Sequence, residues 1–249
     1  MNYVFWAFIA TLFTWFLTAS GSLCVFFFKN IKEKIMNMFL GFSAGIMIAA
    51  SFFSLLAPAK EFSGDSAWFN LSLGFITGGM ILIVFDIVLK KLRKKSCSRT
   101  SMLISSITMH NIPEGLVVGV AFGALKGQEL TFINMLPALS IAFGIGLQNF
   151  PEGAAVSLPL RREGYTPLRS FFYGQLSGVV EPIFGVLGAI SVGFFTSMLP
   201  FALSFAAGAM IFVAVKELIP EAEKNKGYLS SLGCISGFTV MMLLDVLLS

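Results

Sequence analysis

Apolar stretches recur from one end of the chain to the other, separated by short polar connections. The hydrocarbon core of a bilayer is about 30 Å thick, and roughly 20 apolar residues in a helix cross it. Hydrophobic residues make up 56% of the 249 residues and charged residues only 12%, which excludes a water-soluble enzyme. The sequence therefore predicts an all-α polytopic membrane protein.

The apolar pattern predicts eight transmembrane helices in a single transmembrane domain that covers residues 1–249. The predicted spans cover residues 4–28, 35–58, 67–89, 101–125, 131–160, 170–193, 197–220 and 228–248. No linker between these spans is long enough to separate two domains, so we expect one compact unit.

Lys and Arg are distributed unevenly over the connections. Fifteen of the 17 follow spans 1, 3, 5 and 7, and only Lys60 and Lys126 lie in the other connections. Short cytoplasmic loops collect Lys and Arg, so both termini are expected outside a plasma membrane, the inner membrane of a bacterium. The basic run from Lys90 to Arg99 is expected to form a loop that faces the lipid headgroups, and no nucleic-acid partner is expected.

Three acidic residues lie well within predicted spans, without Lys or Arg at a comparable depth. They are Glu114, Glu152 and Glu181. An ionised carboxylate in hydrocarbon costs at least a few kcal/mol, so each must be protonated, hydrated or paired with a cation. Because the protein supplies no such partner, the missing cation is interpreted as the substrate.

Two of these acids belong to an internal repeat. The motif His-Asn-Ile-Pro-Glu-Gly at residues 110–115 returns as Gln-Asn-Phe-Pro-Glu-Gly at residues 148–153. Residues four apart share a helix face, so each motif forms a small ligand cluster. The prolines free backbone carbonyls and are expected to kink predicted spans 4 and 5. Gly115 and Gly153 are expected to let a neighbouring helix approach closely.

Successive spans run antiparallel, so the two motifs should meet near mid-membrane, where Glu181 of span 6 can join them. Oxygen ligands with one imidazole suit zinc, iron(II) or manganese better than Cu(I), and bridging carboxylates could hold two ions. The predicted metal-binding residues are His110, Asn111, Glu114, Gln148, Asn149, Glu152 and Glu181, with Met47 as an additional candidate. No catalytic cofactor is expected, because the metal is the transported substrate.

Three further acids are candidates for a path by which the ion would leave. Asp86, Glu217 and Asp245 are interpreted as lying toward the cytoplasmic ends of spans 3, 7 and 8. They are either hydrated surface charges or a second acidic station on that path, and the sequence leaves both readings open.

Two alternatives to a metal transporter remain at this point. An intramembrane metal-dependent hydrolase would use the ion to activate water, but such sites usually hold two or three His residues and this chain has one. A proton-coupled carrier of small organic cations would use the same acids without metal.

The two motifs, the acid of span 6 and the eight-span plan resemble the ZIP (Zrt/Irt-like) metal transporters, in particular their prokaryotic GufA-type branch. The resemblance implies a homodimer that imports divalent ions, with zinc first and iron, manganese, cobalt or cadmium as further substrates. It implies a binuclear site, in which His110, Glu114, Gln148 and Glu152 bind one ion. Asn111, Asn149 and Glu181 bind the other, with Glu114 and Glu152 shared.

The resemblance further implies an elevator-like motion of spans 1, 4, 5 and 6 against spans 2, 3, 7 and 8. This chain departs from many members in carrying Gln148 and Lys216 where they carry His, and in having a short basic connection between spans 3 and 4. A neutral amide binds zinc less well than an imidazole, so Gln148 is expected to broaden the metal preference.

Overall fold

The computed structural model describes residues 2–28, 32–64, 67–92, 99–194, 199–224 and 227–248, without the side chains of residues 89, 90, 92, 99–110, 193, 194 and 248. No strand occurs in these ranges. The helices are α1 (Tyr3–Ser22), α2 (Cys24–Phe27), α3 (Glu33–Ala50), α4 (Ala57–Ser63), α5 (Ala67–Leu92), α6 (Arg99–Gly123), α7 (Phe132–Arg162), α8 (Pro167–Gly178), α9 (Val180–Phe194), α10 (Leu199–Val213), α11 (Ile219–Ala222) and α12 (Tyr228–Leu248).

Several of these helices follow one another with only a local change in winding. The π-helical stretch η1 (Ser51–Leu56) joins α3 to α4, and η4 (Ala214–Leu218) joins α10 to α11. Leu23 interrupts the first span between α1 and α2, and Val179 interrupts the sixth between α8 and α9. The sixth predicted span is therefore two helical segments, and the second of them starts one residue before Glu181.

Seven helical stretches in the described ranges are long and apolar enough to cross a membrane, and Asn111–Gly123 is a shorter apolar helix within α6. The prediction of an all-helical polytopic membrane protein is confirmed. Polar caps set several helix starts: the side chain of Asn2 accepts from the backbone N–H of Val4, and that of Thr131 accepts from Asn134 N–H.

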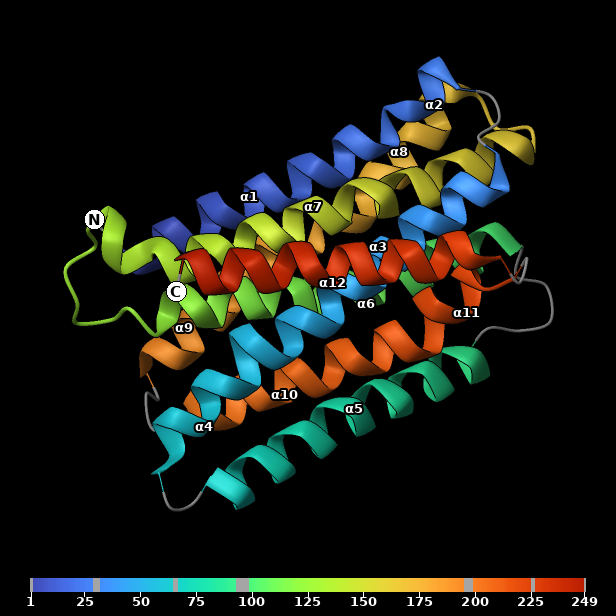
Figure 1. The fold of residues 1–249 in the computed structure, drawn as a ribbon. Helices are drawn as coiled ribbons and strands as arrows, with labels where there is room; N and C mark the ends of the chain where they lie inside the picture. The colour runs from blue at the N-terminus through green and yellow to red at the C-terminus, as the bar shows by residue number, and fades with distance from the viewer. Residues whose placement is uncertain are drawn as a thin grey trace.

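The long helices form two packed groups. The first bundle consists of α1, α6, α7, α8 and α9, with close pairs α1/α7 and α6/α9; the second bundle consists of α3, α5, α10 and α12, with close pairs α3/α12 and α5/α10. Figure 1 shows α1 and α5 at opposite edges of the molecule. In all four pairs a glycine lies against the backbone of the partner helix, as small residues allow in membrane helices.

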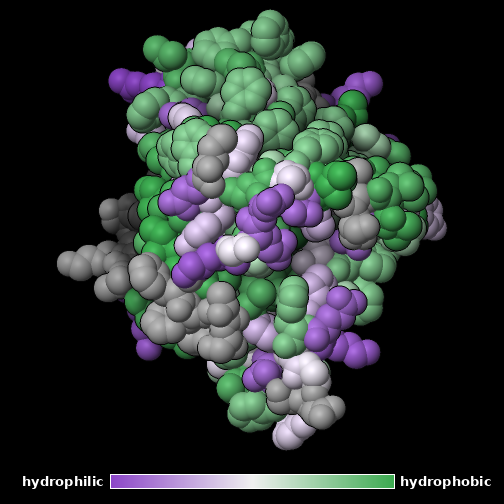
Figure 2. All heavy atoms as spheres, turned by 90° about the vertical axis from the view of Figure 1, so that its left-hand side faces the viewer, coloured by the Kyte–Doolittle hydropathy of each residue, from purple (hydrophilic) through white to green (hydrophobic). Residues whose placement is uncertain are grey.

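Both termini lie at the same end of the molecule, and the C-terminal ends of α2, α5, α7 and α11 lie together at the opposite end (Figure 1). These four helix ends precede the connections in which most Lys and Arg are found. Seen from the end with the termini, hydrophilic side chains gather near the middle and hydrophobic side chains cover much of the flanks (Figure 2). The helix ends that lead into the basic connections thus lie at the end of the molecule opposite the termini.

Candidate metal-binding site

The described polar side chains of both repeated motifs come together inside the first bundle. Asn111 and Glu114 lie on α6, Gln148 and Glu152 on α7, and Glu181 in the first turn of α9. Each of these side chains, and that of Asn149, is at most 2% exposed. Buried polar groups need partners, so the hydrogen bonds of this cluster define what it can bind.

Glu181 is completely surrounded by donors from its own bundle. Its Oε1 accepts from Asn111 Nδ2 at 2.8 Å and from Thr18 Oγ1 at 3.4 Å. Its Oε2 accepts from Asn149 Nδ2 at 2.9 Å and from the hydroxyl of Thr14. A carboxylate has about four lone-pair positions, so the four donors occupy all of them.

A carboxylate can only accept, and it therefore fixes which way a neighbouring amide points. Glu181 takes the NH₂ groups of Asn111 and Asn149, and Glu114 Oε1 takes Gln148 Nε2 at 2.6 Å. The carbonyl oxygens of the three amides must then point away from these acids. They are left free to face a cation.

The cluster contains buried oxygens without any hydrogen-bond partner. They are Asn111 Oδ1, Glu114 Oε2, Gln148 Oε1, Asn149 Oδ1 and both carboxylate oxygens of Glu152. A buried polar atom without a partner costs about 1–3 kcal/mol, and more if it is charged. Within the described side chains, no Lys or Arg forms an ion pair with any of the three buried acids. A cation could act as the partner of these oxygens.

The three carboxylates lie near enough to repel one another when they are ionised. Among the described side chains, however, no three from His, Cys, Asp and Glu converge tightly enough to hold one ion between them. The amide oxygens of Asn111, Gln148 and Asn149 are further possible ligands among the described side chains. The predicted ligand His110 lies on α6, but its side chain is outside the described residues.

The motif residues other than the ligands have structural roles. Pro113 lies inside α6 and Pro151 inside α7, so each helix continues through its motif. A Cβ at Gly115 would lie 2.5 Å from the backbone oxygen of Glu181, and one at Gly153 would overlap the carbonyl of Thr18. The predicted close helix approach at both glycines is confirmed.

The contribution of α1 to the cluster was not predicted from the sequence. Thr14 and Thr18 are fully buried hydroxyls in an apolar helix, and both contact Glu181. The sequence does contain a pattern that indicates this polar face. Hydroxyl side chains recur every three or four residues along one face of the helix, at Thr11, Thr14, Thr18 and Ser22. Ser43 of α3 was also missed, and it donates to the backbone oxygen of Gln148 at 3.0 Å.

The remaining candidates lie on helices of the second bundle or on the η4 stretch that follows α10. Met47 is fully buried on α3, where it belongs to the main apolar core. Asp86 near the end of α5 and Glu217 in η4 lie toward the end of the molecule opposite the termini. Asp245 instead accepts from Ser54 Oγ at 2.9 Å, near the end with the termini.

The interpretation that all three acids lie toward the same end is therefore wrong for Asp245. The helix α12 runs antiparallel to α5 and α10, so a residue near its C-terminus lies at the end where those helices begin. Asp86 and Glu217 alone remain at the end with the basic connections.

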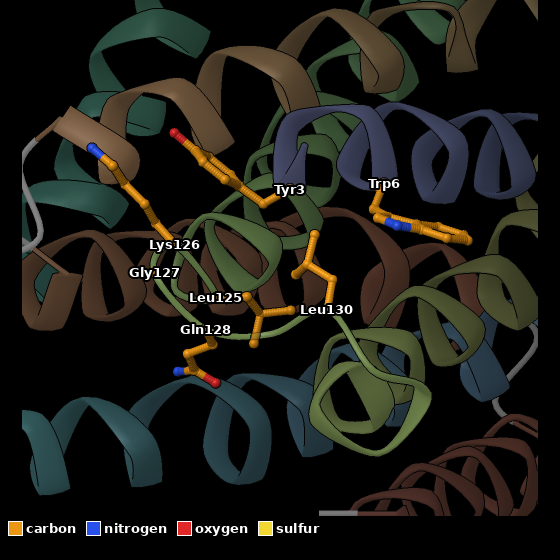
Figure 3. Close-up of a pocket in the computed structure, with 7 residues that line it drawn as sticks. All are labelled: Tyr3, Trp6, Leu125, Lys126, Gly127, Gln128 and Leu130. Atoms are coloured by element: carbon orange, nitrogen blue, oxygen red, sulfur yellow. The ribbon is translucent and has the colours of Figure 1, made fainter. Parts of the chain in front are cut away.

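A surface pocket of about 450 Å³ lies away from the acidic cluster. Figure 3 shows its lining residues, from the first turn of α1 and from the connection between α6 and α7. They are Tyr3, Trp6, Leu125, Lys126, Gly127, Gln128 and Leu130. None of the predicted metal-binding residues lines it.

A model of the family described as ZIP Zinc transporter matches residues 93–245, which include both motifs and Glu181. The chain belongs to the ZIP zinc transporter family. The chain is similar to the Homo sapiens protein named zinc transporter ZIP11, with 37% identity over 98% of this chain and 97% of that protein. It is 32% identical to the Myxococcus xanthus protein named zinc transporter GufA, over 96% and 97% of the two chains.

A third relative, from Campylobacter jejuni, is named zinc transporter ZupT and is 30% identical over 96% of this chain and 95% of that protein. The resemblance to the ZIP family and its GufA-type branch is thus confirmed. ZIP-family membership also confirms the prediction that the chain is a transporter of divalent metal ions and not an enzyme. The intramembrane hydrolase is set aside on this ground.

Proposed function

We propose that this ZIP-family chain carries zinc, and related divalent ions, into the cytoplasm through the buried cluster of the first bundle. The observation that carries the proposal is the set of buried, unpartnered oxygens on Asn111, Gln148, Asn149 and Glu152, together with Glu114 Oε2. Oxygens held in a low-dielectric interior without a positive partner are stabilised by a divalent ion that enters from water.

The chemistry of the donors supports a divalent ion that must also leave again. Carboxylate and amide oxygens suit zinc, manganese and iron(II), and the neutral amides of Asn111, Gln148 and Asn149 bind more weakly than imidazoles. Since Glu114 and Glu152 lie on neighbouring helices, we propose that they bridge two ions held side by side. His110 would complete one of these ligand sets.

We further propose that the first bundle moves as a unit against the second. The described hydrogen bonds of the motif side chains stay within α1, α6, α7 and α9, while Ser43 of α3 donates only to a backbone oxygen. Glycine-to-backbone contacts join α1 to α7 and α6 to α9, and they join α3 to α12 and α5 to α10. Contacts of this kind hold the two helices of each pair together, and each pair lies within one bundle, so sliding between the bundles would leave these contacts and the cluster intact.

We propose that both termini face outward and that the four basic connections face the cytoplasm, in a plasma membrane or bacterial inner membrane. The uneven distribution of Lys and Arg supports this orientation. Asp86 and Glu217 would then lie near the inner end of the path, and Asp245 near the outer end. A homodimer is proposed on the family resemblance alone.

Zinc uptake into liposomes tests the proposed function directly. Liposomes that contain the purified chain should take up radioactive zinc faster than empty liposomes, and manganese, iron(II), cobalt and cadmium should compete to different degrees. Metal analysis of the purified chain should find bound ion. Uptake equal to that of empty liposomes, or a chain free of metal that carries an organic cation instead, would contradict the proposal.

Labelling of single cysteines tests the proposed orientation. In a chain whose Cys24, Cys97 and Cys234 are replaced by alanine, a cysteine at exposed Gln128 should react with a membrane-impermeant maleimide from outside intact cells. A cysteine at exposed Glu163 should react only after the cells are opened. The reverse pattern would invert the proposed topology.

A further inference from the structure

A buried hydrogen bond joins the two bundles beside the acidic cluster. Ser43 Oγ of α3, in the second bundle, donates to the backbone oxygen of Gln148 of α7, in the first, at 3.0 Å, and both residues are fully buried. The same two helices also form an ion pair across the bundles, between Glu33 and Arg162 at 4.0 Å, but both side chains are exposed and such pairs contribute little. The bond from Ser43 is therefore the stronger polar contact of the two.

Ser43 differs in this bond from two other buried serines outside the first bundle. The hydroxyls of Ser51 and Ser204 donate to the backbone oxygen four residues earlier in their own helical stretches, at 2.7 and 2.8 Å. A serine inside a helix commonly has this bond available. If the two bundles moved apart, Ser43 could turn to the backbone oxygen of Phe39 in the same way. The bond to Gln148 can therefore break without leaving a buried hydroxyl unpaired, which would cost much more.

The bundles are closed against each other on the side of the cluster that faces the termini. Gly144 lies one helical turn before Gln148 on α7, and therefore nearer to the end with the termini. The thioether of Met241 of α12 fills the place that a Cβ at Gly144 would take, and Met241 is fully buried. Beyond the motif, Ala154 and Leu158 belong to a second, smaller apolar core. With the proposed termini outside, the structure is thus the state closed to the outside.

We propose that Ser43 is a positioning residue that holds the first bundle in this outer-closed state, through its bond to the backbone of Gln148. The bond must break before the first bundle can slide and the cluster can open to the outside. Its strength thereby sets the fraction of chains that is outward-facing. The inference rests on the proposed function and deepens it, because it names a contact that the motion of the bundles must break.

Two roles for Ser43 predict opposite changes in zinc uptake. Far below the KM for zinc, the uptake rate is proportional to the fraction of chains that is outward-facing. If Ser43 holds the outer-closed state, Ser43→Ala raises this fraction, and kcat/KM for zinc offered from outside rises about threefold. If Ser43 only keeps Gln148 in place to bind the ion, the same variant lowers kcat/KM. The sign of the change therefore decides between the two roles.

Labelling of a single cysteine measures the outward-facing fraction directly and without zinc. The reporter is Met241→Cys in a chain whose Cys24, Cys97 and Cys234 are replaced by alanine. Because Met241 is fully buried where the bundles meet, a membrane-impermeant maleimide should reach the reporter from outside intact cells only when that side opens. Adding Ser43→Ala should raise the labelling rate about threefold, as for uptake. Ser43→Thr keeps the hydroxyl and should leave the rate unchanged.

Ser204→Ala is the matched control. Ser204 is also a fully buried serine of the second bundle, but its hydroxyl bonds within α10, so its loss should change neither kcat/KM nor the labelling rate. An equal rise in Ser204→Ala would reduce the effect to a general loosening of the bundle. An unchanged labelling rate in Ser43→Ala, or a fall in its kcat/KM, would overturn the proposal.

Two other results can be told apart from these. A purely structural hydrogen bond would lower the thermal midpoint of Ser43→Ala without altering the labelling rate, and that result would also overturn the proposal. If the proposed function itself fails, the unchanged chain will not move zinc into liposomes. Labelling without zinc would then still show whether Ser43 holds the outer side closed.

Discussion

Replacing Glu152 by glutamine is expected to reduce zinc uptake to the level of empty liposomes, a loss of at least about 100-fold. Glu152 is 2% exposed, and neither of its carboxylate oxygens has a hydrogen-bond partner. The amide has nearly the same shape as the carboxyl group. It removes the negative charge and puts a non-coordinating NH₂ where an oxygen had faced the ion.

The same variant should fold as well as the unchanged chain. Removing a charge that lacks a buried partner does not destabilise the protein, so the thermal midpoint without metal should not fall. Zinc at about 100 times its dissociation constant stabilises a binding protein by about 2.7 kcal/mol, and this zinc-dependent rise should be lost in Glu152→Gln. Thermal unfolding in detergent, with and without zinc, measures both quantities.

Glu129→Gln is the control for Glu152→Gln. Glu129 is exposed in the connection between α6 and α7, and its substitution removes one negative charge without altering the cluster. It should retain normal uptake and the normal response to zinc. Undiminished uptake in Glu152→Gln would mean that the free oxygens of Glu152 do not face the transported ion, and the proposed site would be wrong.

Replacing Gly153 by alanine is expected to lower the thermal midpoint by about 5–10 °C, because overpacking a close contact costs about 1–3 kcal/mol or more. The new Cβ would overlap the carbonyl oxygen of Thr18, and it would lie 2.9 Å from the carbonyl carbon of Thr18 and 3.0 Å from Ser22 N. These are backbone atoms of α1, which cannot swing aside as a flexible side chain can.

In Gly153→Ala, the widened contact between α1 and α7 is also expected to disturb the hydrogen bonds of the acidic cluster. Ser22 Oγ donates to the backbone oxygen of Gly153 at 3.1 Å, and Asn149 Nδ2 donates to the backbone oxygen of Thr14. Both bonds cross the contact that the alanine would widen. We therefore expect Gly153→Ala to weaken zinc uptake in addition to lowering the thermal midpoint in detergent.

Gly79→Ala provides the comparison. Gly79 is also a helical glycine, on α5, but a Cβ there would meet only the backbone oxygen of Gly208, at an ordinary contact distance of 3.6 Å. Alanine is favoured over glycine in a helix by up to about 1 kcal/mol, so this variant should unfold at the same temperature or higher. An equal fall in both variants would show that the α1/α7 contact has no special role.

The sequence alone determined the fold class and the chemistry of the cluster. Spans of apolar residues must be helical in lipid, because a helix satisfies its own backbone hydrogen bonds. Glu114 and Glu152 stood out because a carboxylate in hydrocarbon needs a cation. Gly115 and Gly153 were correctly assigned to close helix contacts, since their only contribution is the absence of a side chain.

Only the tertiary structure decided which polar groups satisfy one another. Thr14 and Glu181 are 167 positions apart in the sequence, and nothing local to either residue predicts their hydrogen bond. The location of Asp245 likewise depends on the direction in which α12 runs beside its neighbours. Hydrophobic periodicity fixes which segments enter the membrane, whereas hydrogen bonds between helices depend on how those helices are paired and rotated. The partners of each buried oxygen are therefore a property of the assembled bundle.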